Sequence, residues 1–139
     1  MVAIRPAQAS DLPAISALDA RLTGSTKPDY WRDMLAPERN LLVAESEAGR
    51  LLGFIAGEVR AFEFGQPAAG WVFAIQIEPR LRLKGVGTTL FEALVARFKA
   101  EGVTRVRTLV DRKDHLILSF FRAQGMVAGP SLQLDKDVS

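Results

Sequence analysis

Residues 77–90 read Ile-Glu-Pro-Arg-Leu-Arg-Leu-Lys-Gly-Val-Gly-Thr-Thr-Leu. They follow an aromatic and β-branched run, 71–77, that is typical of a buried strand, and they lead into apolar residues at helical spacing. Pro79 closes the strand. Gly85 and Gly87 lack a Cβ atom, so the backbone there can turn sharply and approach a ligand closely. The stretch therefore predicts a strand, a glycine-containing turn and the start of a helix.

The start of this helix has the properties of an anion-binding site. The N–H groups of a first helical turn have no acceptor within the helix, and they lie at the positive end of its dipole. Arg82 and Lys84 add positive charge, and Thr88 adds a hydroxyl group. A pyrophosphate would satisfy several of these donors at once. The stretch contains no G-x-x-x-x-G-K-[ST] run, and its spacing differs from G-x-G-x-x-G, so ATP and NAD are disfavoured.

The turn resembles the acetyl-CoA loop of the GNAT N-acetyltransferases, written [QR]-x-x-G-x-[GA]. Arg82, Gly85 and Gly87 match its three specified positions, and Ile77-Glu78-Pro79 resembles the hydrophobic–x–Pro that precedes it. Leu83 stands where the family often has glycine. The resemblance implies that acetyl-CoA is the acetyl donor and that the backbone of Ile75 and Ile77 holds its pantetheine arm. It implies that the turn binds the phosphates through Arg82, Leu83, Lys84, Gly85, Val86, Gly87 and Thr88.

A second family motif, N-x-x-A-x-x-F-Y-x-x-x-G-F, corresponds in part to residues 114–126. Phe120 and Gly125 agree with it. Four positions differ from the usual asparagine, alanine, tyrosine and phenylalanine: Asp114, Ile117, Phe121 and Met126. The resemblance implies that Asp114 accepts a pantetheine amide while it also caps a helix, and that Phe121 packs on the cofactor. Because phenylalanine cannot donate the proton that the family tyrosine often supplies, the general acid stays unassigned, with water or Ser119 as substitutes.

Patterning along the chain predicts the order βααβββαβαββ in an α/β domain that spans residues 1–139. The runs at 41–44 and 51–59 should pair as an antiparallel hairpin, and the runs at 71–77 and 103–110 should pair in parallel through a helix. The resemblance implies the single-domain acyl-CoA N-acyltransferase fold, a mixed and mostly antiparallel sheet with helices on both faces. The remaining predicted elements are strands at 2–5, 126–128 and 132–134, and helices capped by Ser10 and ended by Gly24, at 29–35, from Val86 to Gly102, and at 115–124.

Composition narrows the class of protein further. The chain has 139 residues, 48% hydrophobic and 24% charged, which suits one folded domain. A formal charge of +2 gives no support for binding to nucleic acid or to a membrane. The absence of cysteine excludes disulfides and a cysteine nucleophile, and one histidine cannot form a multi-histidine metal site, so no metal is expected. No secretory signal or membrane-spanning run is present, which predicts a cytoplasmic protein.

The resemblance implies that an amine attacks the thioester directly in a ternary complex. An alkylamine has a pKa of about 10.4 and is mostly protonated at neutral pH, so a base must remove its proton. Glu78, at the end of one strand, and Glu58, on the preceding strand, are the candidate bases, directly or through water. For each of them, a solvent-facing carboxylate with no catalytic role is the alternative.

The leading hypothesis is an N-acetyltransferase that acts on a primary amine of a small molecule, peptide or protein. The alternative is a non-catalytic acyl-CoA-binding or regulatory module, which the replacement of tyrosine by Phe121 favours. A nucleic-acid binder that uses Arg80, Arg82, Lys84, Arg105 and Arg107 is disfavoured, because the sheet lacks a recognisable pattern of stacking aromatic residues. Residues 24–40 and 62–70 should shape the acceptor pocket, but they carry no diagnostic motif. The acceptor, the length of the acyl group and a homodimeric assembly, common in similar proteins, are left open.

Overall fold

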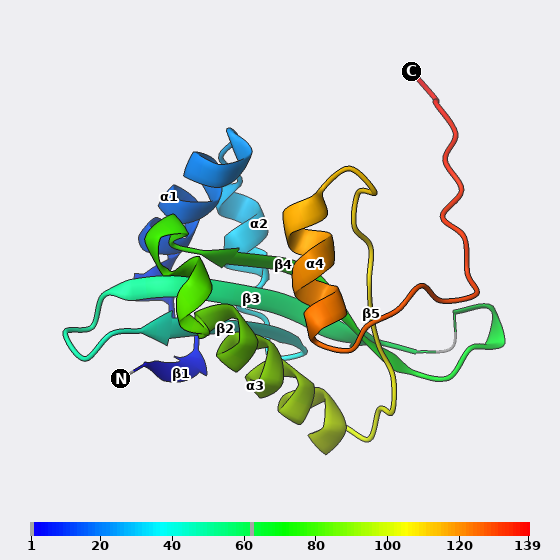
Figure 1. Cartoon of the computed structure of the whole chain (residues 1–139), viewed down its shortest axis with the longest axis horizontal. Helices are drawn as coiled ribbons and strands as arrows, with labels where there is room; N and C mark the ends of the chain where they lie inside the picture. The colour runs from blue at the N-terminus through cyan, green and yellow to red at the C-terminus, as the bar shows by residue number, and fades with distance from the viewer. Residues whose placement is uncertain (1, 62) are drawn as a thin grey trace. The chain divides into compact units, whose positions relative to one another are not determined.

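The computed structural model describes residues 2–61 and 63–139, without the side chain of Leu83. The chain divides into two compact units, residues 1–109 and 110–139, and each is described by itself. The first unit is built on a five-stranded sheet in the order β1-β2-β3-β4-β5 (Figure 1). β1 to β4 are antiparallel neighbours, whereas β4 and β5 are parallel. The strands are β1 Ala3–Pro6, β2 Arg39–Glu45, β3 Leu51–Arg60, β4 Ala69–Ile77 and β5 Val106–Thr108.

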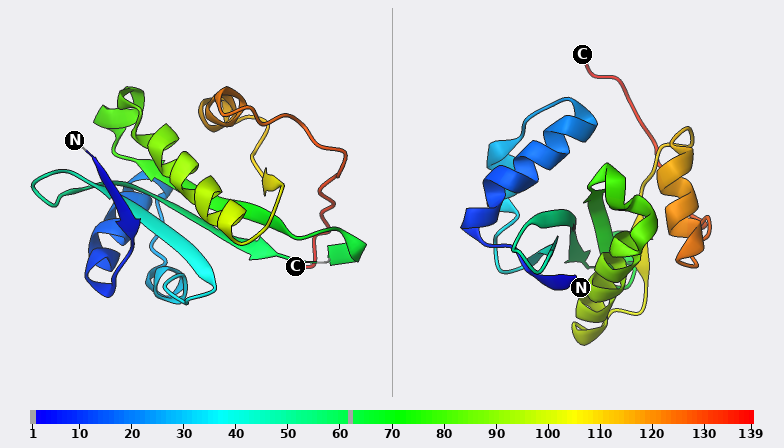
Figure 2. Two further views of the ribbon diagram at one scale, coloured as in Figure 1. Left: turned by 90° about the horizontal axis from the view of Figure 1, so that it is seen from below. Right: turned by 60° about the vertical axis from the view of Figure 1, so that its left-hand side comes forward.

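Helices cover both faces of this sheet, as the resemblance implies. Figure 2 shows α1 (Leu12–Thr23) and α2 (Pro28–Asp33) on one face and α3 (Val86–Ala100) on the other. Three short 3-10 turns complete the first unit: η1 Ala9–Asp11, η2 Glu63–Gly65 and η3 Pro79–Lys84. The predicted hairpin and the predicted strand–helix–strand unit are both confirmed.

The core on the α1 and α2 face contains side chains that recur at helical spacing on α1 and at alternate positions on the strands. Trp31 of α2 is its largest member, and its ring meets Phe54 of β3 edge to face, with 4.9 Å between the centroids. This packing fixes α2 over the middle of the sheet. The buried members of the cluster are Ile15, Leu18, Trp31, Met34, Leu41, Val43, Phe54 and Ala56.

On the opposite face, α3 packs closely against β4 at Gly70. A Cβ atom at Gly70 of β4 would overlap the ring of Phe98, which is fully buried in α3. Glycine is therefore required at this position by the approach of the helix, because a larger residue would push α3 away from the strands.

β4 is paired along its whole length on one side only. Its parallel register with β5 covers Gly70, Trp71 and Val72, and β5 is shorter than the predicted strand at 103–110. Beyond Val72 no strand pairs with β4 on this side within the described residues. On the other side, Gly57 pairs with Val72 and Ala56 with Ala74, so Phe73 is an extra residue that makes a β-bulge. The bulge marks the point where β4 and β5 separate.

The predicted helix cap at Ser10 is wrong. Ser10 lies inside the 3-10 turn η1, and α1 begins only at Leu12. Asp11 takes the organising role instead, because its carboxylate accepts hydrogen bonds from the backbone N–H of Gln8 at 2.7 Å and from the Arg5 guanidinium at 2.8 and 2.9 Å. These charge-assisted bonds are stronger than a serine hydroxyl could make.

The second unit contains α4 (His115–Ala123). Asp114 caps it as predicted, since its Oδ1 accepts the N–H of Ile117 at 3.1 Å. The two predicted strands at 126–128 and 132–134 are wrong, because residues 124–139 form no strand. Each run has only three residues and Gly129 and Pro130 interrupt them, so too few ladder hydrogen bonds would form to offset the ordering of the chain.

Candidate functional site

The predicted glycine turn joins the end of β4 to α3. The N–H of Glu78 donates to the carbonyl of Leu52 at 2.9 Å, and the N–H of Leu81 donates to the carbonyl of Glu78 at 2.8 Å, which starts the turn η3. Gly85 then adopts φ 82° and ψ 4°, a left-handed conformation that disfavours residues with a side chain. Helix α3 begins at the next residue, so the turn has the predicted strand, turn and helix arrangement.

The turn presents positive charge at the start of α3. Arg82 and Lys84 are exposed in η3, and Gly85 is exposed as well. The carbonyl of Gly85 accepts the backbone N–H of Thr89 at 3.1 Å and its hydroxyl at 3.0 Å, which closes the first helical turn. Among the residues that the structure describes, and apart from the two chain neighbours, no heavy atom lies within 4 Å of a Cβ built at Gly85, so the space there is open. Cationic side chains and the helix terminus together form a surface suited to an anion.

The free edge of β4 lies directly before this turn. Because the N–H of Glu78 points toward β3, strand alternation directs the backbone groups of Ile77 and Ile75 away from β3. These are the two residues whose backbone the resemblance implies for the pantetheine arm. Unpaired N–H and C=O groups on such an edge are available for an extended ligand that carries amides.

Glu78 is held by an arginine from another element. Arg21 of α1 donates to both of its carboxylate oxygens, at 2.8 Å to Oε2 and 3.4 Å to Oε1. The Glu78 side chain is only 10% exposed. The hydrogen-bonded Arg21 guanidinium holds the pKa of Glu78 below its ordinary value. The pair therefore fixes α1 to the end of β4.

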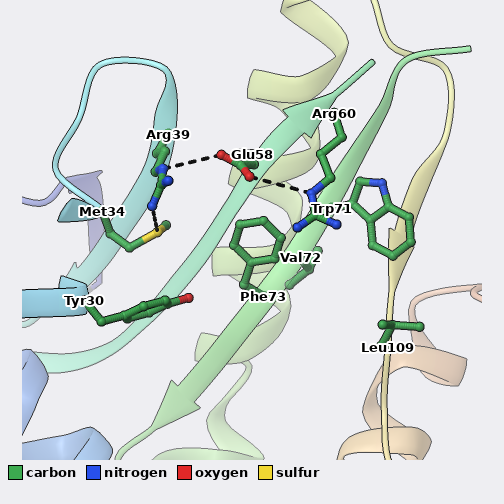
Figure 3. A pocket seen from close by; sticks show the side chains of 9 residues that line it. All are labelled: Tyr30, Met34, Arg39, Glu58, Arg60, Trp71, Val72, Phe73 and Leu109. Carbon is green, nitrogen blue, oxygen red and sulfur yellow. Dashed lines mark hydrogen bonds and ion pairs between the residues drawn. The ribbon is translucent and has the colours of Figure 1, made fainter. Parts of the chain in front are cut away.

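Glu58, the other candidate base, lines an open cavity of about 430 Å³, where it lies between Arg39 and Arg60 (Figure 3). The sheet register places it directly opposite Arg39 on β2 and opposite Trp71 on β4. Its carboxylate forms two long ion pairs, at 3.4 Å to Nε of Arg39 and 3.7 Å to Nε of Arg60, and its side chain is 21% exposed. The cavity is lined by Tyr30, Met34, Arg39, Glu58, Arg60, Trp71, Val72, Phe73 and Leu109.

Aromatic rings form the apolar part of this cavity. The Arg60 guanidinium lies 5.4 Å from the centroid of Trp71 and 5.1 Å from that of Phe73, within the range of cation–π contacts. Tyr30 enters from α2, with its hydroxyl end directed toward Phe73 (Figure 3). Burial raises the pKa of Tyr30, so its phenol stays protonated at neutral pH and can donate a hydrogen bond.

Sequence reasoning placed residues 24–40, which include Tyr30 and Arg39, in the acceptor region, but it gave Arg39 no role and missed Arg21 and Arg60. Arg60 had one available signal, because it alternates with Glu58 and so shares its face of β3. Arg21 and Arg39 had none, since their partners are distant in sequence.

The other predicted site residues, Asp114 and Phe121, belong to the second unit. Asp114 caps α4, and the Phe121 ring meets Phe120 edge to face at 5.3 Å. Their role toward a cofactor stays a prediction. Within residues 2–61 and 63–139, no group of three or more histidine, aspartate or glutamate side chains could hold a metal ion. None of the helices there has the length and apolar character needed to cross a bilayer.

Comparisons with known proteins agree with this geometry. Two solved structures have nearly the same fold at only 16% sequence identity. The aminoglycoside 6'-N-acetyltransferase AAC(6')-Ih from Acinetobacter baumannii has a TM-score of 0.87 and is covered over 100% of both chains. The aminoglycoside N-acetyltransferase AAC(6')-Iy, crystallised with CoA, also has a TM-score of 0.87, with 100% of this chain and 96% of that chain covered.

Curated relatives are closer in sequence but much longer. A mycothiol acetyltransferase of Propionibacterium freudenreichii subsp. shermanii is 29% identical over 125 residues, which is 90% of this chain and 38% of that protein. An L-2,4-diaminobutyric acid acetyltransferase of Nocardia farcinica is 30% identical over 91 residues, which is 66% of this chain and 45% of that protein. The chain thus spans less than half the length of each. The family model of the GNAT acetyltransferases matches residues 7–126, across both units, and the chain belongs to this family.

Proposed function

We propose that this protein transfers the acetyl group of acetyl-CoA to a primary amine. The observation that carries the proposal is the turn at Gly85, which combines the family motif, a left-handed backbone and exposed cations at the start of α3. The free edge of β4 leads straight into this turn. Together they offer donors for a pyrophosphate and an unpaired strand edge for the amides of a pantetheine arm.

The residues that would hold CoA are those of the turn and the strand edge. Arg82, Lys84 and the backbone from Gly85 to Thr88 would bind the phosphates, and Ile75 and Ile77 would bind the pantetheine amides. The contacts of Asp114 and Phe121 with the cofactor stay predictions from the sequence. When bound, acetyl-CoA supplies an acetyl group activated as a thioester.

Glu58 is the better placed of the two candidate bases. It faces a cavity large enough for a small molecule, and its two ion pairs are long, so solvent or an ammonium group can reach its oxygens. A carboxylate in this position can accept the proton that an alkylammonium must lose before it attacks. Glu78 remains the second candidate, but a two-point contact with Arg21 already occupies both of its oxygens.

A direct test compares two glycines with the same backbone. Gly85 and Gly49 both have φ 82° and open space where a Cβ would stand, but Gly49 lies in the connection between β2 and β3. We expect Gly85→Val to weaken CoA binding about tenfold or more, because the left-handed conformation becomes costly. Gly49→Val should change it by less than about twofold. Isothermal titration calorimetry with CoA measures both.

Turnover then separates the enzyme from the non-catalytic alternative. Release of CoA thiol from acetyl-CoA is followed with a panel of amino acids, diamines, peptides and aminoglycosides. Release with any acceptor supports acetyl transfer, whereas CoA binding without release across the panel supports a binding or regulatory module. Absence of CoA binding to the wild type at millimolar concentration, or equal weakening by both glycine variants, would refute the proposed site.

A further inference from the structure

The cavity around Glu58 has a charge pattern that restricts what it can bind. Two arginines and one glutamate line it, so one positive charge is left without a partner among the lining residues. Glu63 is not a lining residue; its carboxylate lies 3.9 Å from Nε of Arg60, and its side chain is more than half exposed. Water screens an exposed pair at this distance, so Glu63 offsets the excess charge only weakly.

Arg60 retains donors that can recognise a ligand. Both of its ion pairs involve Nε, and among the described residues neither Nη atom donates a hydrogen bond. The Cζ atom of the guanidinium lies 5.4 Å from the ring centroid of Trp71 and 5.1 Å from that of Phe73. A guanidinium has five N–H donors in a rigid fork that matches the two oxygens of a carboxylate. The aromatic contacts thus orient a fork with free donors beside the cavity.

We propose that the amine acceptor carries a carboxylate, which Arg60 and Arg39 bind while Glu58 faces the amine. This inference depends on the proposed acetyl transfer for its role but not for its binding site. An amino acid is a zwitterion, so its carboxylate can pair with an arginine while its ammonium pairs with Glu58. The three aromatic rings of Tyr30, Trp71 and Phe73 provide an apolar surface for its side chain.

The same charges disfavour other classes of acceptor. A polycationic amine would face two guanidinium groups and a single carboxylate that is already shared between them, so it would gain little and meet repulsion. A phosphate dianion would exceed the one unpaired positive charge. We therefore expect this cavity to prefer a different class of acceptor from the aminoglycosides that the two similar structures are named for.

The test uses pairs of ligands that differ only in the carboxylate. Phenylalanine is compared with 2-phenylethylamine, ornithine with putrescine, and 2,4-diaminobutyrate with 1,3-diaminopropane, with kanamycin as a polycation. Binding is followed by tryptophan fluorescence, because Trp71 lines the cavity while Trp31 is buried. We expect at least one amino acid to bind, and Arg60→Gln to weaken it about 10- to 100-fold, with less than about threefold change for its decarboxylated partner.

Two further variants separate recognition from folding. Arg60→Lys keeps the charge and should recover part of the affinity, whereas Arg50→Gln removes an exposed arginine before the opposite end of β3 and should leave binding unchanged. If the amine of every pair binds as tightly as its amino acid, if no amino acid binds, or if Arg60→Gln weakens both members equally, the inference is overturned. Arg60-dependent binding of an amino acid without any thiol release would uphold it and refute only acetyl transfer.

Discussion

Glu58 and Glu78 are both partnered by arginine, but their surroundings assign them different tasks. Glu78 receives two hydrogen bonds from one guanidinium, is almost fully buried, and ties α1 to the end of β4. Glu58 is shared between two arginines at longer distance and faces a cavity of about 430 Å³. Both carboxylate oxygens of Glu78 are therefore occupied, whereas the carboxylate of Glu58 stays accessible.

The difference shows that an ion pair alone does not identify a catalytic carboxylate. A short two-point contact favours the ionised form and lowers the proton affinity of the group, which suits a structural role. Longer contacts beside an open cavity hold the group in place while leaving lone pairs for an ammonium. The same substitution, glutamate to glutamine, should therefore have different effects at the two positions.

The largest expected effect is on turnover in Glu58→Gln. Glutamine keeps the size of the side chain but cannot accept the ammonium proton, so kcat should fall about 100-fold or more. The measurement is CoA thiol release under saturating acetyl-CoA with an acceptor that supports activity. Glu38→Gln, at an exposed glutamate just before β2, is the matched control and should leave kcat unchanged.

The assignment of the base to Glu58 would be wrong if the two glutamates exchanged roles. Glu78 would be the base if kcat fell about 100-fold in Glu78→Gln while Glu58→Gln stayed active. Both variants are measured at a temperature where they are folded. Equal and complete loss in both folded variants would indicate that the carboxylates act as a unit, because effects of coupled catalytic groups are not additive.

The turn at Gly85 could be predicted from the sequence because its chemistry is local. The end of the strand, the glycines, the cations and the start of the helix all lie within residues 77–90. The pattern is therefore visible in one short stretch of the sequence. Helix α4 and its Asp114 cap were predicted for the same reason. The strands at 126–128 and 132–134 were predicted wrongly, because apolar runs show β propensity whether or not a partner strand exists.

The cavity could not be predicted because its residues meet only through the sheet register. Arg39, Glu58 and Trp71 form one row across three strands, and no spacing in the sequence reveals that row. The register between β3 and β4 depends on the bulge at Phe73, which shifts every pair beyond it. A single residue of error would move Glu58 to the other face of the sheet.

Glu78→Gln should lower the thermal stability of the protein at neutral pH but not in acid. Arg21 lowers the pKa of Glu78 in the folded protein below the ordinary value of about 4.5, so the unfolded chain binds the proton more readily. The stabilisation is therefore complete above that value and disappears as the pH falls through the folded pKa. The Tm of the wild type should exceed that of Glu78→Gln at pH 7, and the two should converge in acid.

Arg21→Gln provides the partner control for this pair. It should lower the Tm at pH 7. It should also reduce the fall of Tm in acid, since the pKa of Glu78 would then lie closer to its ordinary value. Thermal unfolding followed by circular dichroism at a series of pH values measures all three proteins. A Tm difference between wild type and Glu78→Gln that stays constant down to acid would contradict the assigned role of the ion pair.

The smallest expected effect is that of Tyr30→Phe, which removes one hydroxyl group from the cavity. Because burial raises the pKa of Tyr30, the phenol is a neutral donor at neutral pH and adds a single hydrogen bond to an acceptor. We expect KM for the acceptor to rise about two- to fivefold with little change in kcat. A fall in kcat of the size expected for Glu58→Gln would instead make Tyr30 the missing general acid, which Phe121 cannot be. That outcome would place both proton transfers in the cavity that Tyr30 and Glu58 line, and would leave the Arg21–Glu78 ion pair with a structural role alone.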